Sequence, residues 1–187
     1  MTTNEIIAQI LMTFSILILL SYTVFKVSRR TILICNMVIN LLQAIHYFLM
    51  GPEGATGGAC SLICVLMVLV FYFKGKNRFL SGLWIPAFFI VAFIVFGILT
   101  FETPFSVIPI IGNTLLVVAF WRNTEVAIKG TCIVVAALWV VYNAILLSYV
   151  GLIGQVLSFV LNIVYVARYL YFARKDARQS KSEEKAA

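Results

Sequence analysis

Seven apolar runs alternate with short polar gaps along the chain. Each run is close to the ~20 apolar residues that a helix needs to cross the hydrocarbon core of a membrane. The gaps contain turn formers and charged residues, as in Gly51-Pro52-Glu53-Gly54 and Glu102-Thr103-Pro104. The pattern predicts an all-α membrane protein with seven transmembrane helices, at about 6–25, 31–50, 57–73, 83–101, 104–121, 128–149 and 151–171.

The basic residues orient this predicted bundle. Glu5, Glu53 and Glu102 lie on one side of it, and all 14 Lys and Arg residues lie on the other. The positive-inside rule therefore places the N-terminus outside and the C-terminus in the cytoplasm. Six or eight spans would divide the cations between the two sides, which favours the odd number. The cations of the first, third and fifth gaps are Lys26, Arg29, Arg30, Lys74, Lys76, Arg78, Arg122 and Lys129, and six more end or follow the seventh run.

The composition excludes a soluble protein. Hydrophobic residues make up 63% of the 187 residues and charged residues 11%, whereas soluble domains are about 45–50% apolar and ~25% charged. The mean hydropathy is +1.05. The net charge of +7 follows from the cytoplasmic loops and tail, so we expect no nucleic-acid partner. A multi-pass protein of the plasma (inner) membrane is expected, and the charged residues 173–187 are expected to be a partly disordered cytoplasmic tail.

Catalytic and metal-binding patterns are missing from the sequence. It contains no Ser/His/Asp set, no paired intramembrane carboxylates and no phosphate-binding loop, so we expect no enzyme and no cofactor. The scarcity of charged residues inside the spans argues against an ion pump. The four cysteines lie in apolar runs and are expected to be free thiols. Cys60 and Cys64 share a helix face, but no His, Asp or Glu accompanies them, so no metal site is expected.

An internal repeat relates the two ends of the chain. Aligning 10–50 with 106–146 places Gln43 on Trp139, His46 on Tyr142 and Tyr47 on Asn143. The connecting helix between them makes the repeat parallel, because an odd linker preserves the orientation of both halves. We therefore expect three-helix bundles at 1–78 and 104–172, joined by a linker transmembrane helix within 79–103.

This 3+1+3 plan resembles that of the SWEET-like (PQ-loop, MtN3) transporters. Three segments more closely resemble the bacterial YgjV-type inner-membrane family: Ala44 to Gly51, Ile108 to Gly112 and Trp139 to Asn143. The SWEET resemblance implies hinge prolines, of which Pro109 occupies one position. It also implies a substrate-binding Asn in the third helix of each repeat. Asn162 matches in the second repeat, whereas the region around Ile63 in the first is apolar.

Polar residues at helical spacing form stripes on three of the predicted helices. Any one of them is interpreted as a hydrogen-bonding contact between helices, and for His46 we favour that role over a proton-linked one. The stripes together predict a shared cavity near mid-membrane, because isolated polar groups are unfavourable in hydrocarbon. The candidate substrate-binding residues are Asn40, Gln43, His46, Trp139, Asn143 and Asn162.

The sequence leaves three functions open. The leading one is a small transporter that moves a small, polar, uncharged solute by alternating access without ATP. The first alternative is a membrane scaffold, sensor or accessory subunit that keeps the fold without transporting. The second is a vitamin or nucleoside carrier of the PnuC type, for which Trp139 would supply aromatic stacking. The oligomeric state is also open, with a homodimer as one possibility.

Overall fold

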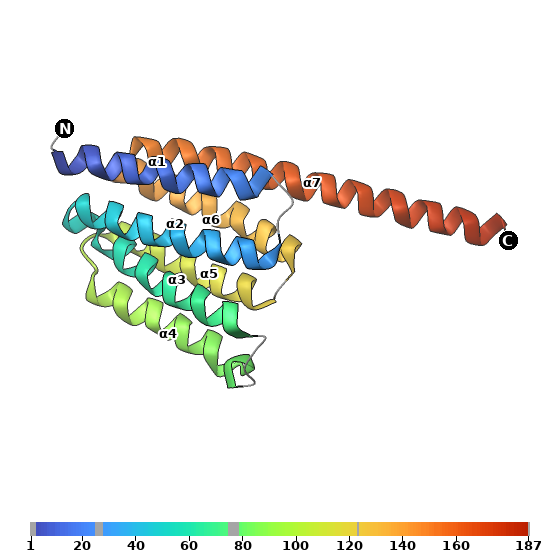
Figure 1. Cartoon of the computed structure of the whole chain (residues 1–187), viewed down its shortest axis with the longest axis horizontal. Helices are drawn as coiled ribbons and strands as arrows, with labels where there is room; N and C mark the ends of the chain where they lie inside the picture. Colours follow the sequence, from blue (N-terminus) through green and yellow to red (C-terminus); the bar gives the residue numbers. More distant parts are fainter. Residues whose placement is uncertain (1–2, 25–27, 75–78, 123, 187) are drawn as a thin grey trace.

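The computed structural model describes residues 3–24, 28–74, 79–122 and 124–186. These residues form seven α-helices, which Figure 1 shows as a bundle from which the end of the last helix projects. Three of the cations that orient the chain, Lys26, Lys76 and Arg78, lie outside the described residues. The α-helices are α1 (Thr3–Val24), α2 (Arg29–Leu49), α3 (Ala55–Phe73), α4 (Trp84–Leu99), α5 (Val107–Arg122), α6 (Glu125–Ile145) and α7 (Tyr149–Ala186). Three short 3₁₀ segments accompany them: η1 (Pro52–Gly54), η3 (Phe79–Ser81) and η4 (Pro104–Ser106).

Six of the described helices are long and apolar enough to cross a membrane, all except α4. Helix α4 has 16 residues, so it is about 24 Å long, against ~30 Å for a bilayer core. Large apolar side chains face outward on the helices, as Ile10, Phe14 and Leu17 do on α1. Such a surface is stable in lipid and would be unfavourable in water. The protein is therefore a multi-pass membrane protein.

The helix ends follow from local sequence chemistry. Ser28 caps α2, where its hydroxyl accepts a hydrogen bond from the backbone N–H of Thr31 at 3.3 Å. Gly51 follows α2 with φ of 98°, a conformation that glycine adopts without a steric penalty. Leu147 occupies the same left-handed region after α6, with φ of 53°. These turns connect the helices tightly and set the positions of α3 and α7.

Consecutive helices run in opposite directions in Figure 1. The links α1–α2, α3–α4 and α5–α6 therefore meet at one end of the bundle, which we call the basic end because Lys74 and Arg30 lie there. The α2–α3 and α6–α7 links meet at the other, which we call the junction end. A closed ring is formed by helices α1, α2, α3, α5, α6 and α7, in which each helix contacts the next and α7 contacts α1. Helix α4 packs outside the ring against α3 and α5.

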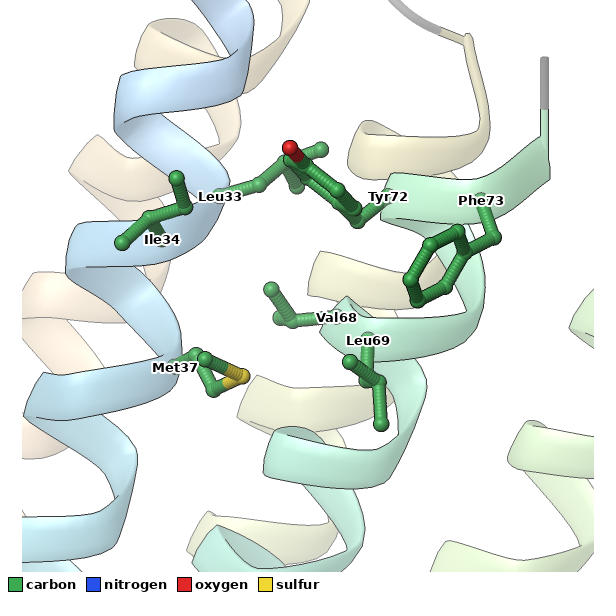
Figure 2. Close-up of a pocket in the computed structure, with 7 residues that line it drawn as sticks. All are labelled: Leu33, Ile34, Met37, Val68, Leu69, Tyr72 and Phe73. Carbon is green, nitrogen blue, oxygen red and sulfur yellow. The ribbon is translucent and has the colours of Figure 1, made fainter. Parts of the chain in front are cut away.

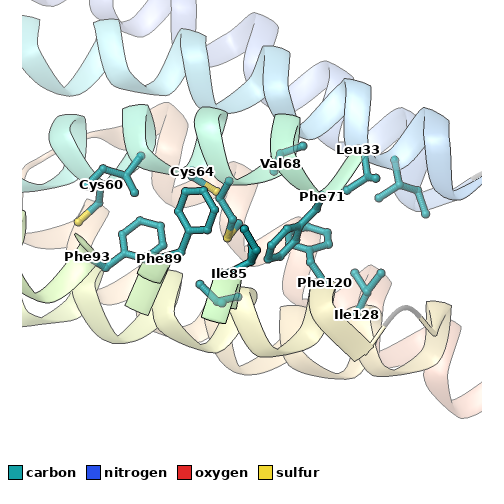
Figure 3. Close-up of a cluster of buried hydrophobic side chains, with 14 of the residues drawn as sticks. Leu33, Cys60, Cys64, Val68, Phe71, Ile85, Phe89, Phe93, Phe120 and Ile128 are labelled. Carbon is teal, nitrogen blue, oxygen red and sulfur yellow. The ribbon is translucent and has the colours of Figure 1, made fainter. Parts of the chain in front are cut away.

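Aromatic and aliphatic side chains fill the space between α3, α4 and α5. Phe71 is fully buried and packs edge-to-face against Phe89 of α4, with ring centroids 5.9 Å apart. Cys60 and Cys64 face the same core, which Figure 3 shows beside Phe89 and Phe93. All four cysteines are free, as expected from the sequence, and these two are buried. This apolar core anchors α4 to the ring.

Two local expectations differ from the structure. Residues 173–186, expected to be partly disordered, continue α7 as one helix to Ala186. Their Ala, Arg, Lys, Glu and Gln residues are strong helix formers, and no turn residue separates them from the apolar part. Lys129, expected in the fifth gap, lies in the second turn of α6 and is only 2% exposed. Helix α6 begins at Glu125, so Lys129 is part of the helix, and its side chain is buried in the bundle near the basic end.

Candidate functional site

A polar cavity lies at the centre of the helix ring. Its volume is about 60 Å³, and its lining comes from α1, α2, α5, α6 and α7. Asn40 and Gln43 line it halfway along α2, and Val135 and Ala136 line it halfway along α6. We call this space the central cavity. Its full lining is Leu19, Asn36, Ile39, Asn40, Gln43, Asn113, Leu116, Cys132, Val135, Ala136, Trp139, Gln155 and Ser158.

Two glutamines of the central cavity lack hydrogen-bond partners. Gln43 is 7% exposed and Gln155 is 6% exposed, yet neither side-chain amide has a partner among the described residues. A buried amide without a partner destabilises a protein by about 1–3 kcal/mol, so native structures rarely retain one. Water or a solute in the central cavity can therefore form hydrogen bonds with these glutamines.

Hydrogen bonds close the junction end next to this cavity. Tyr47 of α2 donates from its hydroxyl to Oδ1 of Asn143 on α6, at 3.3 Å. The Tyr142 hydroxyl accepts from the backbone N–H of Gly57 and donates to the carbonyl of Glu53, both at 3.2 Å. We call the group His46, Tyr47, Trp139, Tyr142, Asn143 and Ser148 the junction cluster.

His46 joins two further helices to this cluster. Its Nδ1 lies 2.8 Å from the carbonyl oxygen of Ala8 in α1. A carbonyl oxygen can only accept, so Nδ1 carries the proton and donates. Nε2 of the neutral ring then accepts from the Ser148 hydroxyl, 3.1 Å away, just before α7. Both ring nitrogens are satisfied, and His46 links α1 to the start of α7.

Aromatic packing and small residues make the junction cluster dense. Trp139 is stacked on Tyr47 with ring centroids 5.4 Å apart and planes 20° apart. Tyr142 meets both rings edge-on. Gly57 lies against these rings, and Gly151 lies against the Asn143 amide, where a Cβ atom would overlap Oδ1. Glycine is required at both places by close approach.

The six predicted site residues are distributed over the two regions as follows: Trp139 belongs to both, and Asn162 lies in neither. Asn40, Gln43 and Trp139 line the central cavity. His46 and Asn143 lie in the junction cluster instead, where both ring nitrogens of His46 and both amide atoms of Asn143 have hydrogen-bond partners. Asn162 is buried one turn beyond the cavity. Its amide donates to the backbone carbonyl and hydroxyl of Ser158, so it positions a cavity residue rather than lining the cavity.

The predicted hinge, Pro109, lies in the first turn of α5, where proline fits without removing a helical hydrogen bond. Its carbonyl accepts from the amide of Asn113 at 2.9 Å. Asn113 lines the central cavity and is missing from the predicted site. The sequence contains a signal for Asn113, because this residue is an isolated amide in an apolar run. It has no polar neighbours at helical spacing, which is why the stripe pattern did not include it.

Two lysines near the basic end contact aromatic rings. Lys74 of α3 donates to the carbonyl of Trp121 at 3.1 Å, and its ammonium lies 3.3 Å from the centroid of that indole ring. Lys129 of α6 places its ammonium 5.1 Å from the centroid of the Tyr165 ring on α7. Cation–π contacts of this kind stabilise an ammonium that has lost part of its hydration. These contacts tie α3 to α5 and α6 to α7.

An apolar groove with a volume of about 300 Å³ lies between α2 and α3 (Figure 2). Leu33 and Met37 of α2 face Val68 and Tyr72 of α3 across it. Phe73 is 41% exposed at its edge, so the groove lies on the lipid-facing surface. Among the described residues, no three His, Cys, Asp or Glu side chains lie close enough together to hold a metal ion.

Comparison with protein families identifies the chain. The model of a family described as bacterial inner membrane protein, Imp-YgjV, matches residues 6–171. The chain belongs to this family. The match begins in α1 and ends within α7, so it includes the whole ring, the central cavity and the junction cluster. The comparison with curated proteins gives no match, and the comparison with solved structures gives none either.

Proposed function

We propose that this Imp-YgjV protein is a small transporter that moves a small, polar, uncharged solute by alternating access without ATP. The central cavity is the observation that carries the proposal. It lies halfway along α2 and α6, between the first three and the last three ring helices, and amides line it. Midplane sites between two helical bundles are the usual binding sites of secondary transporters.

The proposed architecture is a SWEET-like 3+1+3 parallel repeat, in which α1–α3 correspond to α5–α7. Helix contacts support it, because each contact has an equivalent in the other half. The α1–α2 contact corresponds to α5–α6, α2–α3 corresponds to α6–α7, and α3–α5 corresponds to α7–α1. Tyr47 bonds to Asn143, its partner at a separation of 96 residues. His46 reaches the α6–α7 link at Ser148, and its counterpart Tyr142 reaches the α2–α3 link at Glu53. Reciprocal contacts of this kind are what a twofold relation between the halves produces.

The proposed topology has seven spans, with the N-terminus outside and the C-terminus in the cytoplasm. Arg30 and Lys74 lie beside the links of the basic end, and Arg168 belongs to α7, which extends beyond that end in Figure 1. Helix α4 then crosses as a short span, supported by its packing against α3 and α5. The junction cluster would close the outward side, and rocking of the two halves, with Pro109 as a hinge, would open it.

The size of the cavity weighs against large substrates. Liquid water occupies ~30 Å³ per molecule, so 60 Å³ has room for only a few heavy atoms. A nucleoside or vitamin of the PnuC type would not fit this conformation. One face of Trp139 is already stacked on Tyr47, which reduces the case for aromatic stacking of a substrate. A non-transporting scaffold remains the alternative, and the closed junction cluster is the observation that favours it.

Transport can be tested in proteoliposomes by stopped-flow light scattering with uncharged solutes of increasing size. Ala136 lines the cavity and is 3% exposed, so Ala136→Leu should fill it. We expect solute entry to fall to the rate of protein-free liposomes. Ala137→Leu is the matched control, because Ala137 is exposed on the same helix and should leave entry unchanged.

Two results would contradict the proposal. If wild-type protein conducts none of the solutes faster than protein-free liposomes do, the scaffold alternative replaces transport. If Ala136→Leu and Ala137→Leu conduct solutes equally well, the pathway does not run through the central cavity.

A further inference from the structure

The buried asparagines share one hydrogen-bonding arrangement. Asn40 donates its amide N–H to the backbone carbonyl of Asn36, and Asn113 donates to Pro109, each four residues earlier in the helix. A backbone carbonyl can only accept, so the nitrogen of each amide must be the atom that meets it. Each side chain therefore has its carbonyl oxygen left over. For Asn40 and Asn113, no donor to this oxygen exists among the described residues.

Asn40 and Asn113 both line the central cavity, and one N–H of each amide is bonded to the helix backbone. The carbonyl oxygen and the second N–H of each amide remain for a further partner. Gln43 and Gln155 add two carboxamides that are more than nine-tenths buried and have no partner among the described residues. The indole N–H of Trp139 also lacks a described partner and can donate. A matching ligand both donates and accepts hydrogen bonds.

The charge and the volume of the central cavity restrict the class of ligand further. None of the described residues that line the cavity is charged, so none of them would neutralise an ion. The volume of about 60 Å³ limits the ligand to a few heavy atoms.

We propose that the central cavity binds small uncharged solutes that donate as well as accept hydrogen bonds, of the urea and simple carboxamide class. In such a complex the N–H groups donate to the Asn40, Asn113 and glutamine carbonyls, and the solute carbonyl accepts from Trp139 or a glutamine N–H. This inference names the substrate class of the proposed transporter and rests on that proposal for its physiological role, but the binding itself does not depend on transport.

Three solutes of the same shape separate the effect of hydrogen-bond donors on binding from the effect of size. Urea, acetamide and acetone share a carbonyl carbon with two substituents, and they carry four, two and no N–H bonds. We expect saturation-transfer NMR on the wild-type protein in lipid nanodiscs to show the acetamide methyl signal and to show none for acetone. Added urea should displace acetamide. Equal signals from acetone and acetamide, or no acetamide signal, would overturn the proposal.

Variants test whether the glutamines supply the binding. Gln43→Met and Gln155→Met keep the length of the side chain and remove its hydrogen bonds, so each should weaken acetamide binding about tenfold. Gln9→Met is the matched control. Gln9 has a buried Oε1 without a partner in the described structure, but it does not line the cavity, and its variant should bind normally. Unchanged binding in both cavity variants contradicts the assignment.

Flux and binding together separate this inference from the proposed function. Urea and acetamide that bind through the glutamines but do not cross proteoliposomes would support the ligand class and overturn transport. Flux of other uncharged solutes through the cavity, with no urea or acetamide binding, would support transport and overturn the ligand class.

Discussion

The junction cluster and the central cavity are adjacent polar regions with opposite hydrogen-bonding states. In the junction cluster, both ring nitrogens of His46 and both amide atoms of Asn143 have partners. In the central cavity, Gln43 is 7% exposed and Gln155 is 6% exposed, and neither side chain has a partner among the described residues. A satisfied buried network holds helices together, whereas unsatisfied groups are retained at a stability penalty. The contrast separates the region that stabilises the bundle from the region available to a solute.

The largest effect should come from filling space in the junction cluster. In Gly151→Ala the new methyl group overlaps Oδ1 of Asn143 and must displace the acceptor of the Tyr47 hydroxyl. We expect a loss of about 3 kcal/mol in the free energy of unfolding, from overpacking and a broken buried hydrogen bond. Denaturant titration of the protein in detergent micelles measures it.

Gly130→Ala is the control for this change. A Cβ atom at Gly130 meets no heavy atom within 4 Å, so alanine should leave stability unchanged or raise it slightly through its helix propensity. If the Gly151 variant is as stable as the Gly130 variant, the junction cluster does not have the close packing described.

A smaller effect is expected from removing one hydroxyl. Tyr142→Phe leaves the buried N–H of Gly57 without its acceptor and removes the donor to the Glu53 carbonyl. The expected loss is about 2 kcal/mol, measured by the same titration. Tyr169→Phe is the control, because Tyr169 is 49% exposed and should be neutral. Equal stabilities of the two variants would show that the Tyr142 hydroxyl is not a structural link between α6 and α3.

The smallest effect on stability is expected in the central cavity. Gln43→Met combined with Gln155→Met removes no hydrogen bond to a described residue. The free energy of unfolding should therefore change by less than about 0.5 kcal/mol or rise slightly. Denaturant titration in the same detergent micelles measures this change. A loss comparable to that of Tyr142→Phe would mean that the glutamines are structural contacts between helices, and the distinction between the two regions would disappear.

Helix positions were predictable from the sequence because apolar length and turn residues are local signals. The predicted run 31–50 corresponds to α2 at Arg29–Leu49, and 57–73 to α3 at Ala55–Phe73. The errors have physical causes. Lys129 was assigned to a gap because a charged residue normally ends an apolar run, whereas a ring face of Tyr165 lets it stay inside. The tail was expected to be partly disordered from its polarity, although its residues favour helix.

The sequence by itself determined an all-helical membrane protein, its apolar spans, and the amide-bearing stripes that meet inside it. Periodicity determines which residues of one helix share a face, so Asn40 and Gln43 could be placed together. Only the tertiary structure decided that His46 and Asn143 are committed to contacts and that Gln43 and Gln155 are not. His46 meets Ala8 and Ser148, which are 38 and 102 residues away. Hydrogen-bond satisfaction depends on such distant partners, and no local pattern in the chain encodes them.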